Sequence, residues 1–212
     1  DSLPLQLFDR DSSRFNLQFS VGQVIETENL FFSSKQNGNS LSMKLSVDAY
    51  HYVEYIYTIT DDYLIDFDIN LVGMEKFVPS GINYMNLEWQ MKTPQTEKSK
   101  SNQDMYTGIQ YQYSADKEVD YLSFTSTDEE KIKSKLTWVA FKQQFFSSIF
   151  IAKNGFEKPT LLASTKSETS IYIKELYAKL ELPYTHKNNE QLNFQFYFGP
   201  NDYKILKAYN TG

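Results

Sequence analysis

The sequence predicts a mainly β protein, a large twisted β-sandwich with one short helix at the C-terminal end. Three observations predict this class. Apolar and polar residues alternate with period two in several segments. Tyr and Phe, which favour half-buried pleated surfaces, number 16 each. Tight-turn residues such as Asn37-Gly38-Asn39 separate the alternating segments. We expect residues 1–212 to form a single domain, since all-β domains of about 200 residues are common.

The alternation is clearest in four segments, in which every second residue is apolar and its neighbours are polar. A strand with this pattern buries one face and exposes the other to solvent. The four are 41–47, 65–71, 85–91 and 192–198. Segment 50–60 is apolar and aromatic on both faces, which predicts a central strand covered on both sides. In 171–182 the apolar parity switches, so we expect a β-bulge near Lys174–Glu175.

Turns and loops are expected between these strands. Asn154-Gly155 predicts a second tight turn, 93–104 a polar loop and 128–135 a charged connection. Only the C-terminal end has a helical pattern. After Gly199-Pro200 ends a strand, Asn201 or Asp202 can cap a helix over 201–210, where the side chains with helical spacing are Tyr203, Leu206, Lys207 and Tyr209.

Composition excludes several classes of function. The net charge is −6 without a long Lys/Arg cluster, which argues against nucleic acid and against electrostatic docking to anionic lipid. Cysteine is absent, so a disulfide scaffold, a zinc–thiolate site and a Cys nucleophile are all excluded. The longest apolar run, around 145–152, contains Ser147 and Ser148 and is too short to cross a bilayer. Nothing resembles a signal peptide.

Catalytic and metal-binding patterns are weak. His51, predicted to share a strand face with Val53, and His186, in a polar turn, lie near no nucleophile motif. Asp66, Asp68 and Asn70 resemble the start of an EF-hand loop. The required Gly and the closing acidic residue are replaced by Leu71 and Phe77, so calcium binding is not expected. We therefore predict no catalytic residue, metal or cofactor.

A carbohydrate site is the alternative left open by the composition. A pair of carboxylates for glycoside hydrolysis could come from four residues, Asp61, Asp62, Glu88 and Glu118. Aromatic side chains for sugar stacking could come from three, Tyr111, Tyr113 and Tyr121, although Tyr on strands is more often half-buried packing. The alternative hypothesis is a secreted β-sandwich that binds or modifies carbohydrate.

One segment is distinctive enough to indicate a family. Residues 138–150, WVAFKQQFFSSIF, resemble the W-V-A-x-x-Q-Q-[YF]-F run in the periplasmic domain of YidC-type membrane protein insertases. FYFGP at 196–200 is similar to the strand-Gly-Pro-helix junction of that family. The family-motif residues are Trp138, Gln143, Gln144, Phe145, Phe146, Gly199 and Pro200, and we expect them to be structural. Trp138 and Ala140 should share one strand face, Val139 and Phe141 the other, and Gln143-Gln144 should satisfy main-chain groups at a bend.

The resemblance implies an architecture and a role. The family's periplasmic domain is a super-sandwich of the galactose-mutarotase type, held between the first two membrane helices. This chain would then be a soluble fragment that lacks the first membrane helix, its linker, the earliest strands and the whole membrane core. The implied protein is a multi-pass, non-enzymatic insertase and chaperone of the bacterial inner membrane. Its implied partners are Sec translocon auxiliary proteins and membrane-protein substrates. The resemblance identifies no partner-binding residue.

Overall fold

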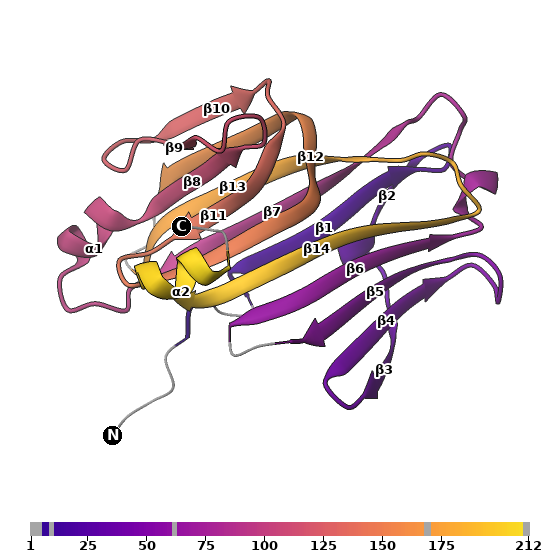
Figure 1. Cartoon of the computed structure of the whole chain (residues 1–212), viewed down its shortest axis with the longest axis horizontal. Helices are drawn as coiled ribbons and strands as arrows, with labels where there is room; N and C mark the ends of the chain where they lie inside the picture. The colour runs from indigo at the N-terminus through magenta and orange to yellow at the C-terminus, as the bar shows by residue number, and fades with distance from the viewer. Residues whose placement is uncertain (1–5, 9–10, 61–62, 168–170, 210–212) are drawn as a thin grey trace.

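The structure is a computed structural model that describes residues 6–8, 11–60, 63–167 and 171–209. The chain forms an elongated, mainly β molecule in which two curved sheets face each other (Figure 1). All strand pairs in these described ranges are antiparallel. The predicted fold class, a mainly β sandwich, is confirmed.

The first sheet has β7 near its middle and short strands at its edges. In spatial order it contains β2 (Val24–Glu26), β1 (Ser13–Ser20), β7 (Tyr84–Pro94), β13 (Tyr172–Pro183), the second part of β12 (Phe146–Lys166) and β10 (Asp128–Ile132). β13 shifts register against β7 between Tyr172 and Glu175. This shift confirms the bulge predicted from the parity of the apolar residues.

The second sheet begins with a meander of four strands and continues through β14. In spatial order it contains β3 (Ser33–Asn37), β4 (Ser40–Ser46), β5 (Tyr52–Ile59), β6 (Leu64–Val72), β14 (Asn189–Pro200), the first part of β12, β11 (Leu136–Lys142), β8 (Gly108–Tyr113) and β9 (Val119–Tyr121). Two single-turn 3₁₀ helices, η1 (Thr27–Asn29) and η2 (Met74–Lys76), lie in the connections.

Strand β12 belongs to both sheets. Residues 146–152 pair with β14 in the second sheet, and residues 160–166 pair with β13 and β10 in the first. Between them lies Gly155, whose φ of +76° bends the strand without ending it. The predicted tight turn at Asn154-Gly155 is therefore wrong. The same turn-forming chemistry makes a bend inside one long strand, because the neighbouring strands keep pairing on either side of it.

The main core fills the space between the sheets and is rich in aromatic rings. Trp89 of the first sheet stacks on Phe141 of the second with ring centroids 3.9 Å apart. Phe15 of β1 meets Phe67 and Phe150 of the opposite sheet edge-on, at 5.5 and 5.7 Å. These rings are buried or half-buried, and they hold the sheets together by excluding water and by favourable ring geometry.

A second, smaller apolar cluster lies on the outer face of the second sheet. Trp138, Ala140, Ile149 and Tyr197 are buried there beneath the C-terminal helix α2 (Tyr203–Ala208), which contributes Ile205 and Leu206. Val139 and Phe141, the alternate residues of β11, point instead into the main core. The alternation predicted for this segment is confirmed, and both faces of the strand are covered.

The other alternation predictions hold for three of the four segments in full. The apolar residues of 65–71, 85–91 and 192–198 face the core, and most of them are buried. In 41–47 the apolar residues lie near an edge; Met43 is half-buried and Val47 is exposed. Segment 50–60 contains β5 with Val53 and Tyr55 buried, but the other face is only half-covered, because no described element packs on it.

Two connections contain unpredicted elements. Helix α1 (Lys100–Tyr106) begins within the predicted polar loop and ends two residues beyond it, and β10 lies within the predicted charged connection. Helix α1 has no apolar stripe. Its buried residue is Gln103, whose side-chain amide accepts from the main-chain N–H of Thr96 and Glu97 and donates to the O of Pro94. Polar anchoring of this kind leaves no periodic signal. No helix in the described ranges is long and apolar enough to span a membrane.

Candidate functional site

Six of the seven family-motif residues, all but Trp138, lie at or beside the turn between β11 and β12. Gln143 is buried, and its side-chain Nε2 donates to the main-chain O of Leu7 at 2.8 Å. The main-chain N–H of Gln143 donates to the O of Phe146 at 2.8 Å and closes the turn. As expected of a buried amide at a bend, Gln143 satisfies main-chain groups. Gln144 differs, because its Oε1 is buried without a hydrogen-bond partner among the described residues.

Asn201 completes this turn from the other side. Its Nδ2 donates to the main-chain O of Gln143 at 2.9 Å and of Gln144 at 3.3 Å, and its Oδ1 accepts from the hydroxyl of Ser147 at 2.6 Å. Its main-chain N–H donates to the O of Phe145. Asn201 thus anchors the chain as it leaves β14. We call Leu7, Gln143, Gln144 and Asn201 the terminal junction, because it joins the first and last described segments.

Close contacts explain why position 199, in the Gly-Pro pair of β14, is a glycine. A Cβ at this position would lie 2.6 Å from the Tyr197 hydroxyl oxygen and 2.9 Å from the Tyr63 ring. The Tyr197 hydroxyl itself donates to the main-chain O of Pro200 at 2.6 Å. Burial raises the pKa of Tyr197 to about 12, so it remains a donor at neutral pH. Asp202, one of the two predicted caps, then caps α2 by accepting from Lys204 and Ile205.

The motif residues therefore divide between core and surface. Trp138 lies in the outer cluster, Gln143 and Gln144 form the turn, and Phe146 starts β12. Gly199 and Pro200 end β14. Phe145 differs, because 53% of its surface is exposed at the tip of the turn. Its structural role stays a prediction, and sequence alone gave no signal that one of two adjacent Phe residues would face solvent.

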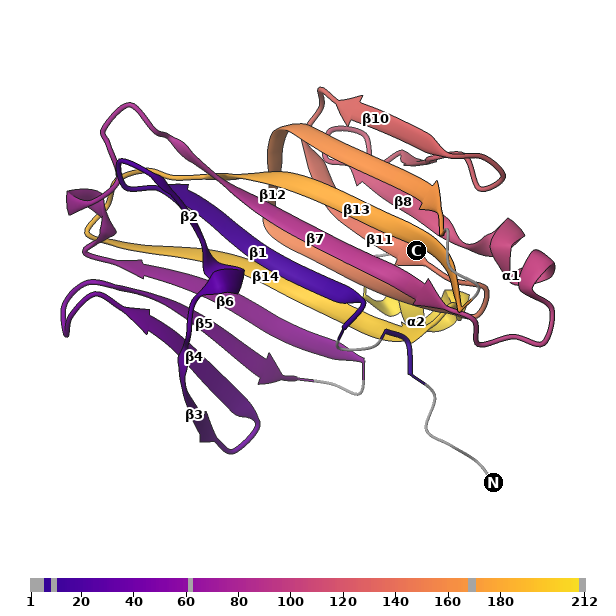
Figure 2. The same ribbon diagram turned by 180° about the vertical axis from the view of Figure 1, so that it is seen from behind.

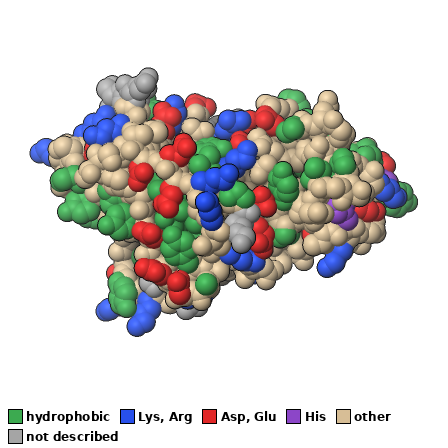
Figure 3. Space-filling view, turned by 90° about the horizontal axis from the view of Figure 1, so that it is seen from above, with side chains coloured by type: hydrophobic (Ala, Val, Ile, Leu, Met, Phe, Trp, Pro, Cys, Tyr) green, Lys and Arg blue, Asp and Glu red, His purple; other side chains and the backbone are tan. Residues whose placement is uncertain are grey.

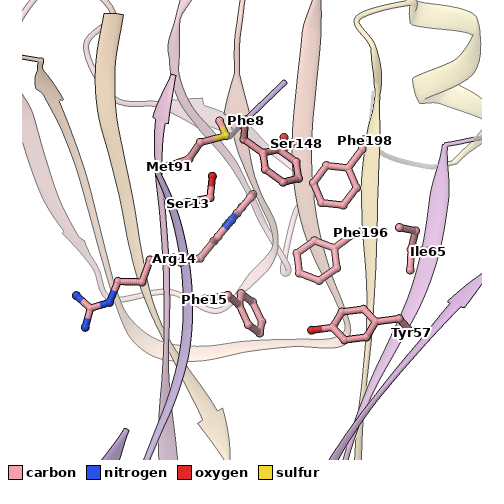
Figure 4. Close-up of a pocket in the computed structure, with 11 residues that line it drawn as sticks. Phe8, Ser13, Arg14, Phe15, Tyr57, Ile65, Met91, Ser148, Phe196 and Phe198 are labelled. Atoms are coloured by element: carbon pink, nitrogen blue, oxygen red, sulfur yellow. The ribbon is translucent and has the colours of Figure 1, made fainter. Parts of the chain in front are cut away.

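A cleft of about 290 Å³ opens between the two sheets beside the terminal junction (Figure 4). Its walls come from Phe15 and Trp89 of the first sheet and Tyr57 and Phe196 of the second. Phe8 lies at the cleft with its ring 5.3 Å from that of Phe198. The cleft is largely apolar. It was not predicted, because its residues come from strands far apart in sequence.

Lys174 is a buried cation that the bulge in β13 turns inward. Its side chain is 1% exposed, and its Nζ donates to the main-chain O of Asp104 at 2.9 Å, of Thr107 at 2.5 Å and of Phe124. The carboxylate of Asp104 lies 3.2 Å away. Burial lowers the pKa of Lys174, and Asp104 opposes that change. Lys174 thus ties the C-terminal end of α1 and the loop after β9 to the first sheet.

The two histidines form hydrogen bonds with different partners in different parts of the molecule. His51 lies in the turn before β5, not on the predicted strand face; its Nδ1 is 2.7 Å from Asp48 Oδ2, and its Nε2 accepts from Lys76 at 3.2 Å. His186 donates from Nε2 to the main-chain O of Ile82 at 2.9 Å. A hydrogen bond from the N–H of Tyr50, together with His51, lowers the pKa of Asp48.

The acidic residues of β6 belong to a cross-strand network on the outer face of the second sheet. Asp66 accepts from Gln195 at 2.8 Å and Asp68 accepts from Asn193 at 2.7 Å. Asn70 donates to Glu54. Within the described ranges, no group of three or more His, Cys, Asp or Glu could hold a metal ion.

The sugar platform of the alternative hypothesis does not form among the described residues. Tyr111 is fully buried and donates to Glu130 at 3.0 Å, whereas Tyr113 is half-buried and Tyr121 is exposed. Because Tyr111 faces the core, the three rings offer no common surface. Of the candidate carboxylates, Glu88 accepts from Tyr177 and pairs with Lys179, and Glu118 is exposed. Asp61 and Asp62 lie outside the described residues.

Comparison with protein families gives one match that spans the chain. The sequence model of the family described as "YidC periplasmic domain" matches residues 1–212. The chain belongs to this family. The match confirms the resemblance seen in residues 138–150 and 196–200, and it extends to the first half of the chain, where only the strand pattern had suggested it.

Relatives with the same domain are similar over nearly all of this chain. The chain is 33% identical over 215 residues to a protein named "Membrane protein insertase YidC" from Bacteroides fragilis, and covers 35% of it. Proteins of the same name from Azobacteroides pseudotrichonymphae and Porphyromonas gingivalis are 33% and 31% identical, matched by 98% and 100% of this chain. The chain thus spans about 35% of the length of these relatives. A heparinase III structure aligns with a TM-score of only 0.35, at 10% identity over 80% of this chain and 21% of its own.

Proposed function

We propose that this chain is the periplasmic interaction and spacer domain of an inner-membrane protein insertase. The observation that carries the proposal is the family match over residues 1–212, supported by relatives named as membrane protein insertases. In this proposal, 1–212 is one domain on the periplasmic side. The rest of the protein lies in the membrane and handles membrane-protein substrates. The domain contributes contacts toward Sec translocon auxiliary subunits.

The structure supports a non-catalytic role through the way its polar groups are used. Inside the sandwich they bind main chain: Gln143 and Asn201 close a turn, and Lys174 ties loops to a strand. Outside, carboxylates pair with amides across neighbouring strands. A sandwich in which these polar side chains bind other groups of the same chain suits a spacer, which must hold its shape while other proteins bind its surface.

The first test of this proposal is complementation. The full-length protein, expressed in cells depleted of their own insertase, is expected to restore insertion of a client membrane protein, measured by protease protection. A control protein with an inactivated membrane region should not restore it. Failure of the intact protein to restore insertion, when it is present at normal abundance, would contradict the proposed function.

The second test addresses the Sec partner. A photo-crosslinking amino acid is placed in the full-length protein at exposed positions spread over the molecule, including Phe31, Tyr50 and Tyr121. Adducts with a Sec auxiliary subunit are expected from a cluster of neighbouring positions, and should vanish in cells that lack this subunit. A scan of all exposed described positions that yields no such adduct, in cells where insertion proceeds, would refute the Sec contact.

A further inference from the structure

The end of the molecule that carries α1, α2 and the β11–β12 turn has a feature that the spacer role does not use. We propose that this end rests on the lipid bilayer that holds the rest of the protein, with four side chains in the interfacial layer. We call Met105, Tyr106, Phe145 and Tyr203 the apolar rim. The inference rests on the proposed function, because it takes the remainder of the protein to be embedded in a membrane.

The position of the terminal segments selects this end. Leu7 and Asn201 both bind the turn at Gln143 and Gln144, so the first described segment and the start of the last one meet at this end of the sandwich. Figures 1 and 2 show α1, α2 and the start of β1 at the same end of the molecule in opposite views. A membrane connected to the chain through these segments therefore faces this end.

The rim residues are apolar and exposed around the same turn. Phe145 is 53% and Tyr203 is 67% exposed, and they flank the bond from the N–H of Asn201 to the O of Phe145. Met105 and Tyr106 end α1 and are about half exposed. Lys142 bridges the two groups, because it pairs with Gly108 just after α1 and its Nζ lies 3.3 Å from the main-chain O of Tyr106. In Figure 3, hydrophobic side chains reach the surface at this end of the molecule.

The chemistry of the rim matches the interfacial layer of a bilayer. Tyr combines an apolar ring with a polar hydroxyl and is enriched at membrane–water boundaries. Lys142 and Lys207 lie beside rim rings, with Nζ 5.9 Å from the centroid of Tyr106 and 5.7 Å from that of Tyr203. Such lysines can place their ammonium groups among lipid headgroups while their stems cover the rings.

The predicted binding is weak and depends on the tether. The net charge of −6 gives no general attraction to anionic lipid, so insertion of apolar side chains must supply the contact. Four partly exposed side chains provide little membrane affinity by themselves. A domain held at the membrane by its own chain has a high effective concentration there, so weak contacts suffice. The test must therefore use the full-length protein.

The opposite end provides a matched control. Tyr50 lies in the turn between β4 and β5 and is 79% exposed, comparable to Tyr203. Exposed apolar residues occur there too, including Val47 and Phe77, but no described terminal segment leaves from that end. Position relative to the membrane therefore distinguishes Tyr203 from Tyr50, whereas side-chain type and exposure do not.

The experiment is spin labelling of the full-length protein in vesicles of phosphatidylethanolamine and phosphatidylglycerol. Residues 1–212 contain no cysteine, so Phe145→Cys, Tyr203→Cys and Tyr50→Cys each create a single site once cysteines elsewhere are replaced. Accessibility of the nitroxide to oxygen, which concentrates in lipid, is compared with accessibility to a water-soluble nickel complex. We expect the oxygen-to-nickel ratio at 145 and 203 to exceed that at 50 several-fold.

Each outcome decides the inference. Labels at 145 and 203 that match the aqueous ratio at 50 would overturn it. Shielding of both labels from both reagents would also overturn it, because it would show protein packed on the rim. Insertion of a client protein is measured in the same vesicles. If the labels at 145 and 203 give the aqueous ratio while the client protein is inserted normally, only the lipid contact is refuted. If the unlabelled protein fails to insert the client, the proposed function is refuted, and the accessibility ratios still test the lipid contact.

Discussion

Single polar side chains decide how several segments are held in this sandwich. Lys174 and Gln103 are buried, and both bind main-chain carbonyl or amide groups of connections that have little apolar surface. A buried polar group is stable only when its hydrogen bonds are made, so these contacts also specify one arrangement of the loops. Tyr55 is another case, since it is buried and donates to the hydroxyl of Thr27 at 3.2 Å.

Replacement of Lys174 tests the loop anchor. Lys174→Met keeps the apolar stem but leaves the main-chain O of Asp104, Thr107 and Phe124 without their ammonium donor. We expect a loss of about 3 kcal/mol in the free energy of unfolding, measured by urea denaturation. The control is Lys166→Met. The exposed Nζ of Lys166 lies 3.9 Å from the same Asp104, and its loss should change the free energy of unfolding by less than about 1 kcal/mol. Equal effects of the two changes would show that Lys174 is not an anchor.

Because Tyr55 is buried, we expect the free energy of unfolding to depend on pH in the alkaline range. Burial raises the pKa of Tyr55 above its ordinary value of 10.0. The stability linked to neutral Tyr55 is therefore complete below pH 10 and is lost as pH rises toward the folded-state pKa, since the unfolded chain ionises first. The expected slope is about 1.4 kcal/mol per pH unit. Urea unfolding between about pH 8 and about pH 11 should show a shallower slope for Tyr55→Phe than for wild type. Tyr50→Phe, at an exposed site, should keep the wild-type slope.

At the scale of elements, the long strand β12 connects the two sheets. It pairs with β14 in its first part and with β13 in its second, so the bend at Gly155 sets the angle at which one sheet continues into the other. The bend has little room. A Cβ at Gly155 would lie 2.6 Å from Lys135 Cε and 3.0 Å from the main-chain O of Leu136.

A pair of glycine substitutions separates backbone strain from close contact. Gly155 and Gly38 both have positive φ, +76° and +58°, but a Cβ at Gly38 would have nothing within 4 Å. Gly38→Ala should therefore lower the free energy of unfolding by about 1 kcal/mol, which is the cost of holding a residue with a Cβ in the left-handed conformation. Gly155→Ala should cost about 1–3 kcal/mol more, because the strand or its neighbours must move. Chemical denaturation of both variants provides the comparison, and equal losses would mean that the bend tolerates a side chain.

At the scale of the whole molecule, two apolar clusters share the second sheet. The main core lies between the sheets, and the outer cluster lies between the second sheet and α2. Strand β11 contributes alternate residues to both, with Phe141 facing the main core and Trp138 facing the outer cluster. Because one strand serves both clusters and β12 serves both sheets, the parts should unfold together.

The two tryptophans report on this coupling. Trp89→Phe leaves Trp138 as reporter of the outer cluster, and Trp138→Phe leaves Trp89 as reporter of the main core. In each variant, the urea transition seen by fluorescence should coincide with that seen by far-ultraviolet circular dichroism. A Trp138 transition at clearly lower urea would show that α2 and its cluster separate before the sandwich unfolds.

Sequence by itself determined the strands whose chemistry is local. Alternation identified β6, β7 and β14, because a half-buried strand must place apolar residues on one side. The parity switch predicted the bulge in β13, and the motif at 138–150 identified the family. These features depend only on residues close together in the chain.

Tertiary structure alone decided the features that depend on distant partners. Asn154-Gly155 became a bend because strands on both sides continue to pair, and α1 formed where its polar side chains found buried acceptors and donors. The same holds at the terminal junction, where Gln143 binds a residue 136 positions away. A sequence pattern shows which groups need hydrogen bonds or burial. Their partners come from segments far away in the chain, so only the folded structure decides the conformation at these positions.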